Sequence, residues 1–217
     1  MAKPAIEHLT VPVISSSGIT IPNILTKATK AADRLAIILP GRGYTIHHPI
    51  LHYLSGILLK HEWDVLRVQY AFQLTGEGLN SQQLPEIYQD TRTAIETTLA
   101  HGYKQICWAG KSMGTPFVAQ FAHEYKDRTC GILHLTPIQQ AVTMSPEDIP
   151  ALALIGTADP HYDAGHVEET AARAQWRVFD ALNHALEAAE DWRGSIHALE
   201  SVLSACEHFI KALDTSS

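Results

Sequence analysis

The sequence is poor in cysteine and contains no long apolar run. Its 217 residues include three cysteines, Cys107, Cys130 and Cys206, whose odd number and wide spacing exclude a disulfide framework and a CxxC metal site. No uninterrupted apolar stretch approaches the ~18 residues that a membrane-spanning helix needs. The first residues lead into no apolar segment of the kind that a signal peptide contains. We therefore expect a cytoplasmic protein without a membrane span.

Basic residues are also scarce. Lysine and arginine number 16 against 23 aspartates and glutamates, so the formal net charge is −7. Non-specific binding of nucleic acid needs a basic surface that displaces counterions from phosphates, and we expect no such partner. Repeats, low-complexity tracts and Pro/Ser-rich linkers are missing as well. With 46% apolar and 18% charged residues, the composition is typical of a packed globule, and we expect one domain over residues 1–217.

Short apolar runs alternate with longer segments of helical periodicity. Near-continuous apolar runs are typical of strands covered on both faces, and their alternation with helices predicts an α/β protein with a mostly parallel sheet. The segment before Asp33 is typical of an antiparallel hairpin with its turn at 15–18. The predicted parallel strands are 35–39, 65–68, 106–109, 132–135, 151–155 and 176–179.

Amphipathic helices are predicted over 50–58, 87–99 and 113–125, and a longer one follows residue 192. The last helix has apolar residues spaced alternately by four and three, a spacing also found in coiled coils between subunits. This stripe covers only about three heptads, so we favour a helix packed on its own sheet, and the oligomeric state stays open. Its members are Trp192, Ile196, Leu199, Leu203, Cys206, Ile210 and Leu213.

One motif is typical of a catalytic nucleophile. A buried strand leads into Gly110-Lys111-Ser112-Met113-Gly114, which matches the G-x-S-x-G pattern of a nucleophile elbow and precedes an amphipathic helix. A tight turn that leads directly from a strand into a helix strains the backbone of its central residue and brings the two backbones close together. Only small residues fit on either side, which explains the two glycines. A serine that merely caps the helix is the alternative. A phosphate-binding P-loop is excluded because Gln105 stands where that motif needs glycine. Lys111, at the variable position, is expected to be solvated.

Partners for the serine follow in a consistent order. A nucleophilic serine needs a base, and the base needs an acid that fixes its tautomer. Asp159 follows the strand 151–155, and His184 follows the strand 176–179. Loops at the carboxyl ends of parallel strands gather in one crevice, so Ser112, Asp159 and His184 can meet there. Asp163 is the alternative acid.

The loop after strand 35–39 is a candidate oxyanion hole. It contains Pro40-Gly41-Arg42-Gly43, and the backbone N–H groups of Arg42 and Met113 would stabilise a tetrahedral oxyanion. A dinucleotide-binding turn is the less favoured alternative, since Ile46 replaces its third glycine.

These motifs together resemble the α/β-hydrolase superfamily over nearly the whole chain. The resemblance implies an eight-stranded, mostly parallel sheet and a cofactor-free Ser-His-Asp hydrolase. Two features depart from many members. Pro40-Gly41 replaces their His-Gly, and the segment 137–150, where many relatives insert a helical cap, is very short. We therefore expect a minimal cap and an open acyl site.

The positions of several aromatic residues and histidines along the chain predict their surroundings. Tyr44, Tyr70 and Phe72 follow strand ends on the functional edge and are candidates for lining an acyl pocket, with core packing as the alternative. His161 is expected on the surface and His134 in the core. The two His-Glu segments at 61 and 123 lack the second histidine of a zinc-protease helix. His161 and His166 bracket Asp163 at a spacing that could bring two imidazoles together, but we favour surface histidines and expect no metal and no cofactor.

The sequence thus predicts a serine hydrolase that cleaves a carboxylic ester or thioester, with a small-molecule acyl compound as its substrate. The alternative is a non-catalytic binding or scaffold module with the same fold. A transferase or lyase that uses the same serine is a third possibility.

Overall fold

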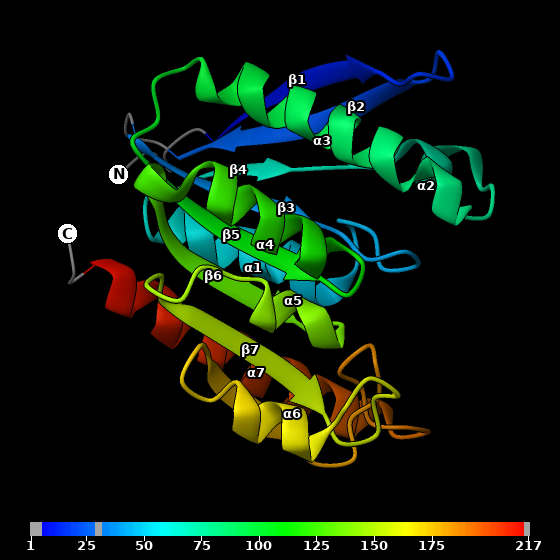
Figure 1. Ribbon diagram of the computed structural model, residues 1–217, viewed down its shortest axis with the longest axis vertical. Helices are drawn as coiled ribbons and strands as arrows, with labels where there is room; N and C mark the ends of the chain where they lie inside the picture. The colour runs from blue at the N-terminus through cyan, green and yellow to red at the C-terminus, as the bar shows by residue number, and fades with distance from the viewer. Residues whose placement is uncertain (1–5, 29–31, 215–217) are drawn as a thin grey trace.

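One mostly parallel sheet forms the centre of the molecule (Figure 1). The computed structural model describes residues 6–28 and 32–214, and within these ranges eight strands form one sheet in the order β1-β2-β4-β3-β5-β6-β7-β8. β2 pairs antiparallel with β1 and β4, and all other neighbours are parallel. The strands are β1 (Glu7–Ile14), β2 (Thr20–Lys27), β3 (Arg34–Leu39), β4 (Asp64–Arg67), β5 (Gln105–Lys111), β6 (Thr129–Leu135), β7 (Ala151–Gly156) and β8 (Gln175–Phe179).

The predicted strands are confirmed. The six apolar runs form β3 to β8, and the hairpin is β1 with β2. Its turn is closed by a 2.9 Å hydrogen bond from the Gly18 N–H to the Ser15 carbonyl, and Gly18 has a φ of 78°, a conformation that glycine adopts without strain.

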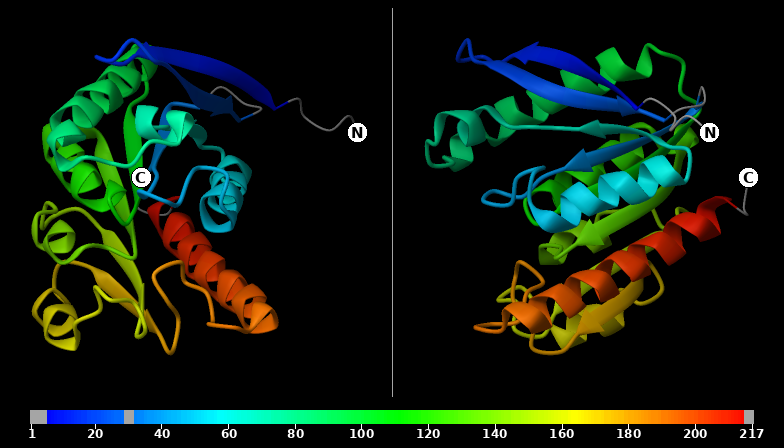
Figure 2. Two further views of the ribbon diagram at one scale, coloured as in Figure 1. Left: turned by 90° about the vertical axis from the view of Figure 1, so that its right-hand side faces the viewer. Right: turned by 180° about the vertical axis from the view of Figure 1, so that it is seen from behind.

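Helices cover both faces of the sheet (Figure 2). On one face lie α1 (Pro49–Lys60) and α7 (Trp192–Asp214), and on the other lie α3 (Leu84–Leu99), α4 (Gly114–Glu124) and α6 (Ala164–Glu169). The short elements are α2 (Ala71–Thr75), α5 (Gln139–Thr143) and the 3₁₀ helices η1 (Ser81–Gln83) and η2 (Lys126–Arg128). Only α5 lies between β6 and β7, where the sequence predicts a minimal cap. Within the described ranges, no helix is long and apolar enough to cross a membrane.

The core has two layers because strand residues alternate between the faces of the sheet. Along β3, Leu35 and Ile37 join the cluster beneath α3 and α4, whereas Ala36 and Ile38 join the cluster beneath α1 and α7. Each fully buried Leu or Ile contributes about 1.5–3 kcal/mol of hydrophobic transfer free energy. This double coverage explains why the strands are apolar at nearly every position.

The apolar stripe of α7 is buried only in part. Its C-terminal half, including Cys206 and Ile210, packs in the α1/α7 layer, so the helix covers its own sheet. At its N-terminal end, Trp192 and Ile196 are 63% and 55% exposed. This exposed end lies near the carboxyl edge of the sheet, where the candidate site is found.

Candidate active site

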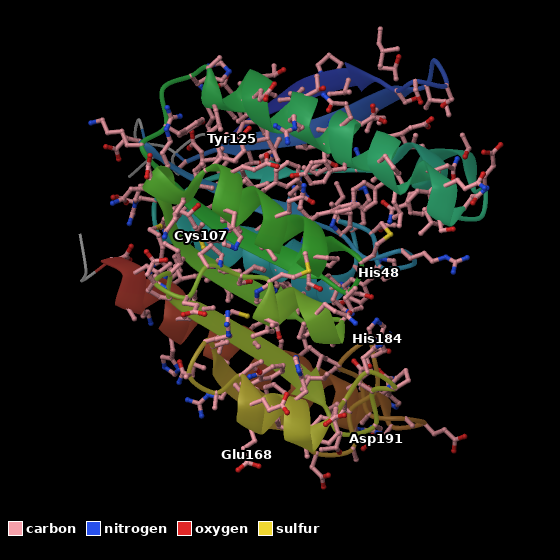
Figure 3. All side chains as sticks on the ribbon, in the orientation of Figure 1. His48, Cys107, Tyr125, Glu168, His184 and Asp191 are labelled. Carbon is pink, nitrogen blue, oxygen red and sulfur yellow. The ribbon has the colours of Figure 1, made fainter. Side chains whose placement is uncertain are left out.

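Four loops meet at the carboxyl edge of the sheet. They follow β3, β5, β7 and β8, and because these strands are parallel their carboxyl ends share one edge. Figure 3 shows His184 at this edge, beside the end of β7. The edge therefore gathers residues that lie far apart in the sequence.

The turn after β5 has the strained geometry that its sequence predicts. Ser112 has a φ of 50°, in the left-handed region that side chains rarely adopt. The backbones on either side are close: a Cβ on Gly110 would lie 2.8 Å from the Gly114 carbonyl oxygen, and one on Gly114 would lie 2.5 Å from that of Leu39. The next residue, Met113, precedes the first turn of α4, so the Ser112 hydroxyl stands at the N-terminal end of that helix.

Ser112, His184 and Asp159 form a continuous hydrogen-bonded chain. Nε2 of His184 lies 2.7 Å from Oγ of Ser112, and Nδ1 of His184 lies 2.7 Å from Oδ2 of Asp159. The Asp159 side chain is fully buried, whereas that of His184 is 34% exposed. The three side chains thus have the relative geometry that a nucleophilic serine, its base and an orienting acid would need.

Asp159 is held in its charged form. Burial by itself would raise the pKa of this carboxyl group, but the hydrogen bond with His184 and a 2.9 Å hydrogen bond from the His161 N–H outweigh it, so the pKa lies below its ordinary value. The carboxylate is therefore available at neutral pH to stabilise a protonated His184.

Asp163, the alternative acid, has another task. Its Oδ1 accepts a 3.0 Å hydrogen bond from the His166 N–H, and it is the N-cap of α6. Asp159 is the carboxylate that the structure brings to His184.

The loop after β3 lies against the elbow. A Cβ on Gly41 would lie 3.3 Å from Cβ of Ser112, and the Gly41 N–H donates a 3.0 Å hydrogen bond to the Tyr44 carbonyl. Among the described residues, the N–H groups of Arg42 and Met113 have no hydrogen-bond acceptor. Two free donors beside a serine hydroxyl can bind an oxyanion.

A cavity of about 580 Å³ opens beside Ser112. Its walls include Tyr44 and Ala185, which also line a second, more apolar cavity of about 170 Å³ between the start of α1 and α7. Neither cavity is lined by Tyr70 or Phe72. These two rings pack in the core instead, 5.8 Å apart and stacked, because Tyr70 and the first turn of α2 lie against the α3/α4 layer.

Lys111 is not solvated, contrary to the sequence-based expectation. Its side chain is buried, with the residue only 1% exposed, and it lines the cavity beside Ser112. The alternation of side chains along β5 could have indicated this burial, because Cys107 and Ala109, on the same side of the strand as Lys111, belong to the α1/α7 layer.

Two histidines show further features of the site. His161 is exposed, as expected, but its ring centroid lies 5.3 Å from that of His184, so it borders the site. His134 is buried, as expected, and its Nε2 lies 2.9 Å from Oγ of Ser145; burial lowers its pKa to about 3. In the part of the chain that the structure describes, no group of three or more His, Cys, Asp or Glu side chains is placed to hold a metal ion.

Comparisons with known proteins identify the fold. No family model matches the sequence, and no curated protein matches it. Among solved structures, a protein of unknown function from Agrobacterium tumefaciens, classed as an α/β hydrolase, is 17% identical with a TM-score of 0.77, and the match covers 96% of this chain and 98% of that chain. A serine hydrolase without a lid from Xanthomonas campestris is 15% identical with a TM-score of 0.72, over 95% and 94% of the two chains. The esterase Est1E from Butyrivibrio proteoclasticus, solved with ferulic acid bound, is 15% identical with a TM-score of 0.71, over 94% and 99%. The chain therefore has the α/β-hydrolase fold.

Proposed function

We propose that the protein is a serine hydrolase that cleaves a carboxylic ester or thioester through an acyl-enzyme intermediate. The observation that carries this proposal is the unbroken chain from Ser112 through His184 to Asp159, set on a strained elbow. A serine that only caps a helix would need neither the histidine nor the buried carboxylate.

The first half of the reaction transfers the acyl group to the enzyme. Ser112 Oγ attacks the carbonyl carbon while His184 Nε2 takes the hydroxyl proton, and Asp159 stabilises the resulting imidazolium. The backbone N–H groups of Arg42 and Met113 donate to the oxyanion of the tetrahedral intermediate. The intermediate collapses, His184 returns the proton to the departing alcohol or thiol, and the acyl group remains on Ser112.

The second half releases the acid. A water molecule gives its proton to His184 and attacks the acyl carbon, and collapse of the second intermediate returns the proton to Ser112 Oγ. The short β6–β7 connection, with α5 alone, supports a minimal cap on a single domain, which leaves the cavity open to water and substrate.

Two structures with this fold and the lining of the second cavity support an ester as the substrate. Est1E is solved with ferulic acid, a carboxylic acid, and another structure with this fold, from Anabaena variabilis, is named a dienelactone hydrolase. A lactone is a cyclic ester, so both are consistent with ester cleavage. The second cavity, walled by Ile50, Ile196 and Leu199 next to the first, offers an apolar place for an acyl chain.

Turnover of a series of p-nitrophenyl esters and acyl thioesters tests the proposal. The wild type is expected to hydrolyse at least part of the series, and Ser112→Ala to lose about 10⁴-fold or more in kcat. Ser201→Ala, the same change on the outer side of α7, is the matched control and is expected to match the wild type. Wild-type turnover in Ser112→Ala contradicts the proposal, and a wild type inactive on the whole series favours a binding module.

A further inference from the structure

The side chain of Lys111 joins three loops of the candidate site. Its Nζ donates hydrogen bonds to Oγ1 of Thr136, at 2.5 Å, and to the carbonyl oxygen of His184, at 2.7 Å. It also lies 5.0 Å from the ring centroid of Tyr44. The three donors of the ammonium group thus face a hydroxyl, a carbonyl and an aromatic ring.

All three partners of this ammonium group are uncharged, which makes its burial costly. Lysine is almost never fully buried without a paired charge, because desolvation opposes its charged form. Burial lowers the pKa of Lys111 to about 8, and the more distant carboxylates of Asp159 and Glu187 offset only part of this effect. An apolar side chain would fill the same space without this cost, so packing alone does not account for a lysine here.

Two of the partners are themselves fixed. Thr136 follows β6 with a φ of 45°, and its N–H donates a 2.7 Å hydrogen bond to the Leu154 carbonyl of β7. Tyr44 accepts hydrogen bonds at both ends, from the Gly41 N–H to its carbonyl and from the Ile50 N–H to its hydroxyl. The ammonium group therefore connects the main chain of His184 to two anchored points beside the elbow.

We propose that Lys111 is a positioning residue, whose ammonium group holds the main chain of His184 against the elbow and so keeps the imidazole within hydrogen-bond distance of Ser112. The inference rests on the proposed function, because His184 is taken as the base. Lys111 itself touches no reacting atom. Its effect is on where His184 stands, and a displacement of about 1 Å in such a group can cost about 100-fold in rate.

A lysine that binds an anionic substrate is the competing role. In that role the ammonium group would face the cavity with a free donor, whereas here its donors are directed at Thr136, His184 and the Tyr44 ring. The two roles separate in kinetics, since loss of a positioning contact lowers kcat, and loss of a substrate contact raises KM.

Two variants and one control test the proposal. Lys111→Met removes the ammonium group and retains the bulk of the stem, and Thr136→Val removes one acceptor with the shape and branching kept. Thr129→Val makes the same change at the opposite end of β6, where Oγ1 contacts Trp108 and Tyr125. We expect kcat to fall about 100-fold in Lys111→Met and several-fold in Thr136→Val, with KM within about threefold of the wild type. Thr129→Val is expected to keep the wild-type kcat.

The dependence of kcat on pH shows whether Lys111 acts through its charge or only fills space. The titratable residues around Nζ are Tyr44 and His184, which it contacts, and the more distant carboxylates of Asp159 and Glu187. Burial raises the pKa of Tyr44 to about 12, above the range tested. As Lys111 loses its proton above about pH 8, its charge-assisted hydrogen bond to the His184 carbonyl weakens, and wild-type kcat is expected to decline. Lys111→Met is expected to lack this decline.

Amide hydrogen exchange gives a readout that does not depend on turnover. Peptides covering residues 182–188 are expected to exchange faster in Lys111→Met and Thr136→Val than in the wild type, and unchanged in Thr129→Val. Unchanged exchange in the first two variants overturns the inference even if the enzyme acts on no tested ester. Wild-type kcat, or a raised KM at unchanged kcat, in Lys111→Met also overturns it. If Lys111→Met does not fold, the same measurements on Thr136→Val test the inference, and unchanged exchange or wild-type kcat in that variant overturns it. Failure of the proposed function is recognised by a different result, namely that Ser112→Ala keeps the turnover of the wild type.

Discussion

Oδ2 of Asp159 lies 2.7 Å from Nδ1 of His184, although 25 residues separate them in the sequence. The loops that carry them are pressed together: a Cβ on Gly156 would lie 2.0 Å from the Leu182 carbonyl oxygen, and the Ala158 N–H donates a 3.0 Å hydrogen bond to that same oxygen. The position of the acid relative to the base is thus built into the backbone at the ends of β7 and β8.

This relationship predicts the effect of replacing the acid. Asp159→Asn keeps the size of the side chain but no longer fixes the tautomer of His184, so kcat is expected to fall by about 10³–10⁴-fold. Asp163→Asn is the matched control, because asparagine caps α6 as well as aspartate does, and kcat is expected to stay at the wild-type value. A large loss in Asp163→Asn with normal kinetics in Asp159→Asn would reverse the assignment of the acid.

The close backbone approach at the elbow predicts opposite effects of Gly→Ala on stability. Gly114→Ala places a Cβ 2.5 Å from the Leu39 carbonyl oxygen, and the free energy of unfolding is expected to drop by about 1–3 kcal/mol. Gly56→Ala lies within α1 with nothing within 4 Å, and the free energy of unfolding is expected to rise by about 0.5–1 kcal/mol. Urea unfolding midpoints at constant m value measure both. Equal midpoints for the two variants would contradict the tight elbow.

The buried lysine predicts how stability depends on pH. The pKa of Lys111 is about 8 in the folded protein against 10.5 ordinarily, so between these values the unfolded chain binds more protons than the folded one. The free energy of unfolding therefore rises with pH across this window, and this gain is lost as the pH falls back through about 8. Relative to Lys111→Met, the wild type is expected to gain roughly 3 kcal/mol between pH 8 and pH 10.5. Urea unfolding of both proteins across this window measures the difference, and parallel curves would show that Lys111 is not buried as a charged group.

The apolar cavity between α1 and α7 predicts selectivity for acyl length. Ile196 lines it and is 55% exposed, so Ile196→Asp should fold while making the cavity unfavourable for hydrocarbon. We expect kcat/KM for an octanoyl ester to fall about tenfold, with the acetyl ester unaffected. Ile14→Asp, at a 73% exposed isoleucine on β1, is the control and is expected to change neither. Equal losses on both esters in Ile196→Asp would place the acyl chain elsewhere.

Much of the fold and site could be predicted because local patterns report them. Double-sided burial makes β3 to β8 apolar throughout, and the tight elbow imposes glycines at 110 and 114. Ser112, Asp159 and His184 each follow a strand of the parallel part of the sheet, whose carboxyl ends lie on one side, so their meeting could be predicted from the sequence.

What escaped prediction depends on contacts between distant segments. The alternation along β5 indicates on which side Lys111 lies, but its partners, Thr136 and the His184 carbonyl, are 25 and 73 residues away, and no local pattern encodes them. Tyr70 and Phe72 follow a strand end, as a pocket residue would, but Tyr70 packs against Phe117 and Phe72 stacks on Tyr70, so both rings lie in the core.

Labelling by a fluorophosphonate, followed by peptide mapping, tests the central claim most directly. The reagent reacts with a serine that a neighbouring base activates, so its adduct reports the nucleophile without knowledge of the substrate. We expect one adduct, on Ser112, which is lost in Ser112→Ala and formed at the wild-type rate in Ser201→Ala. An adduct that persists in Ser112→Ala, that maps to another residue, or that does not form in the folded wild type would contradict the assignment of Ser112 as an activated nucleophile.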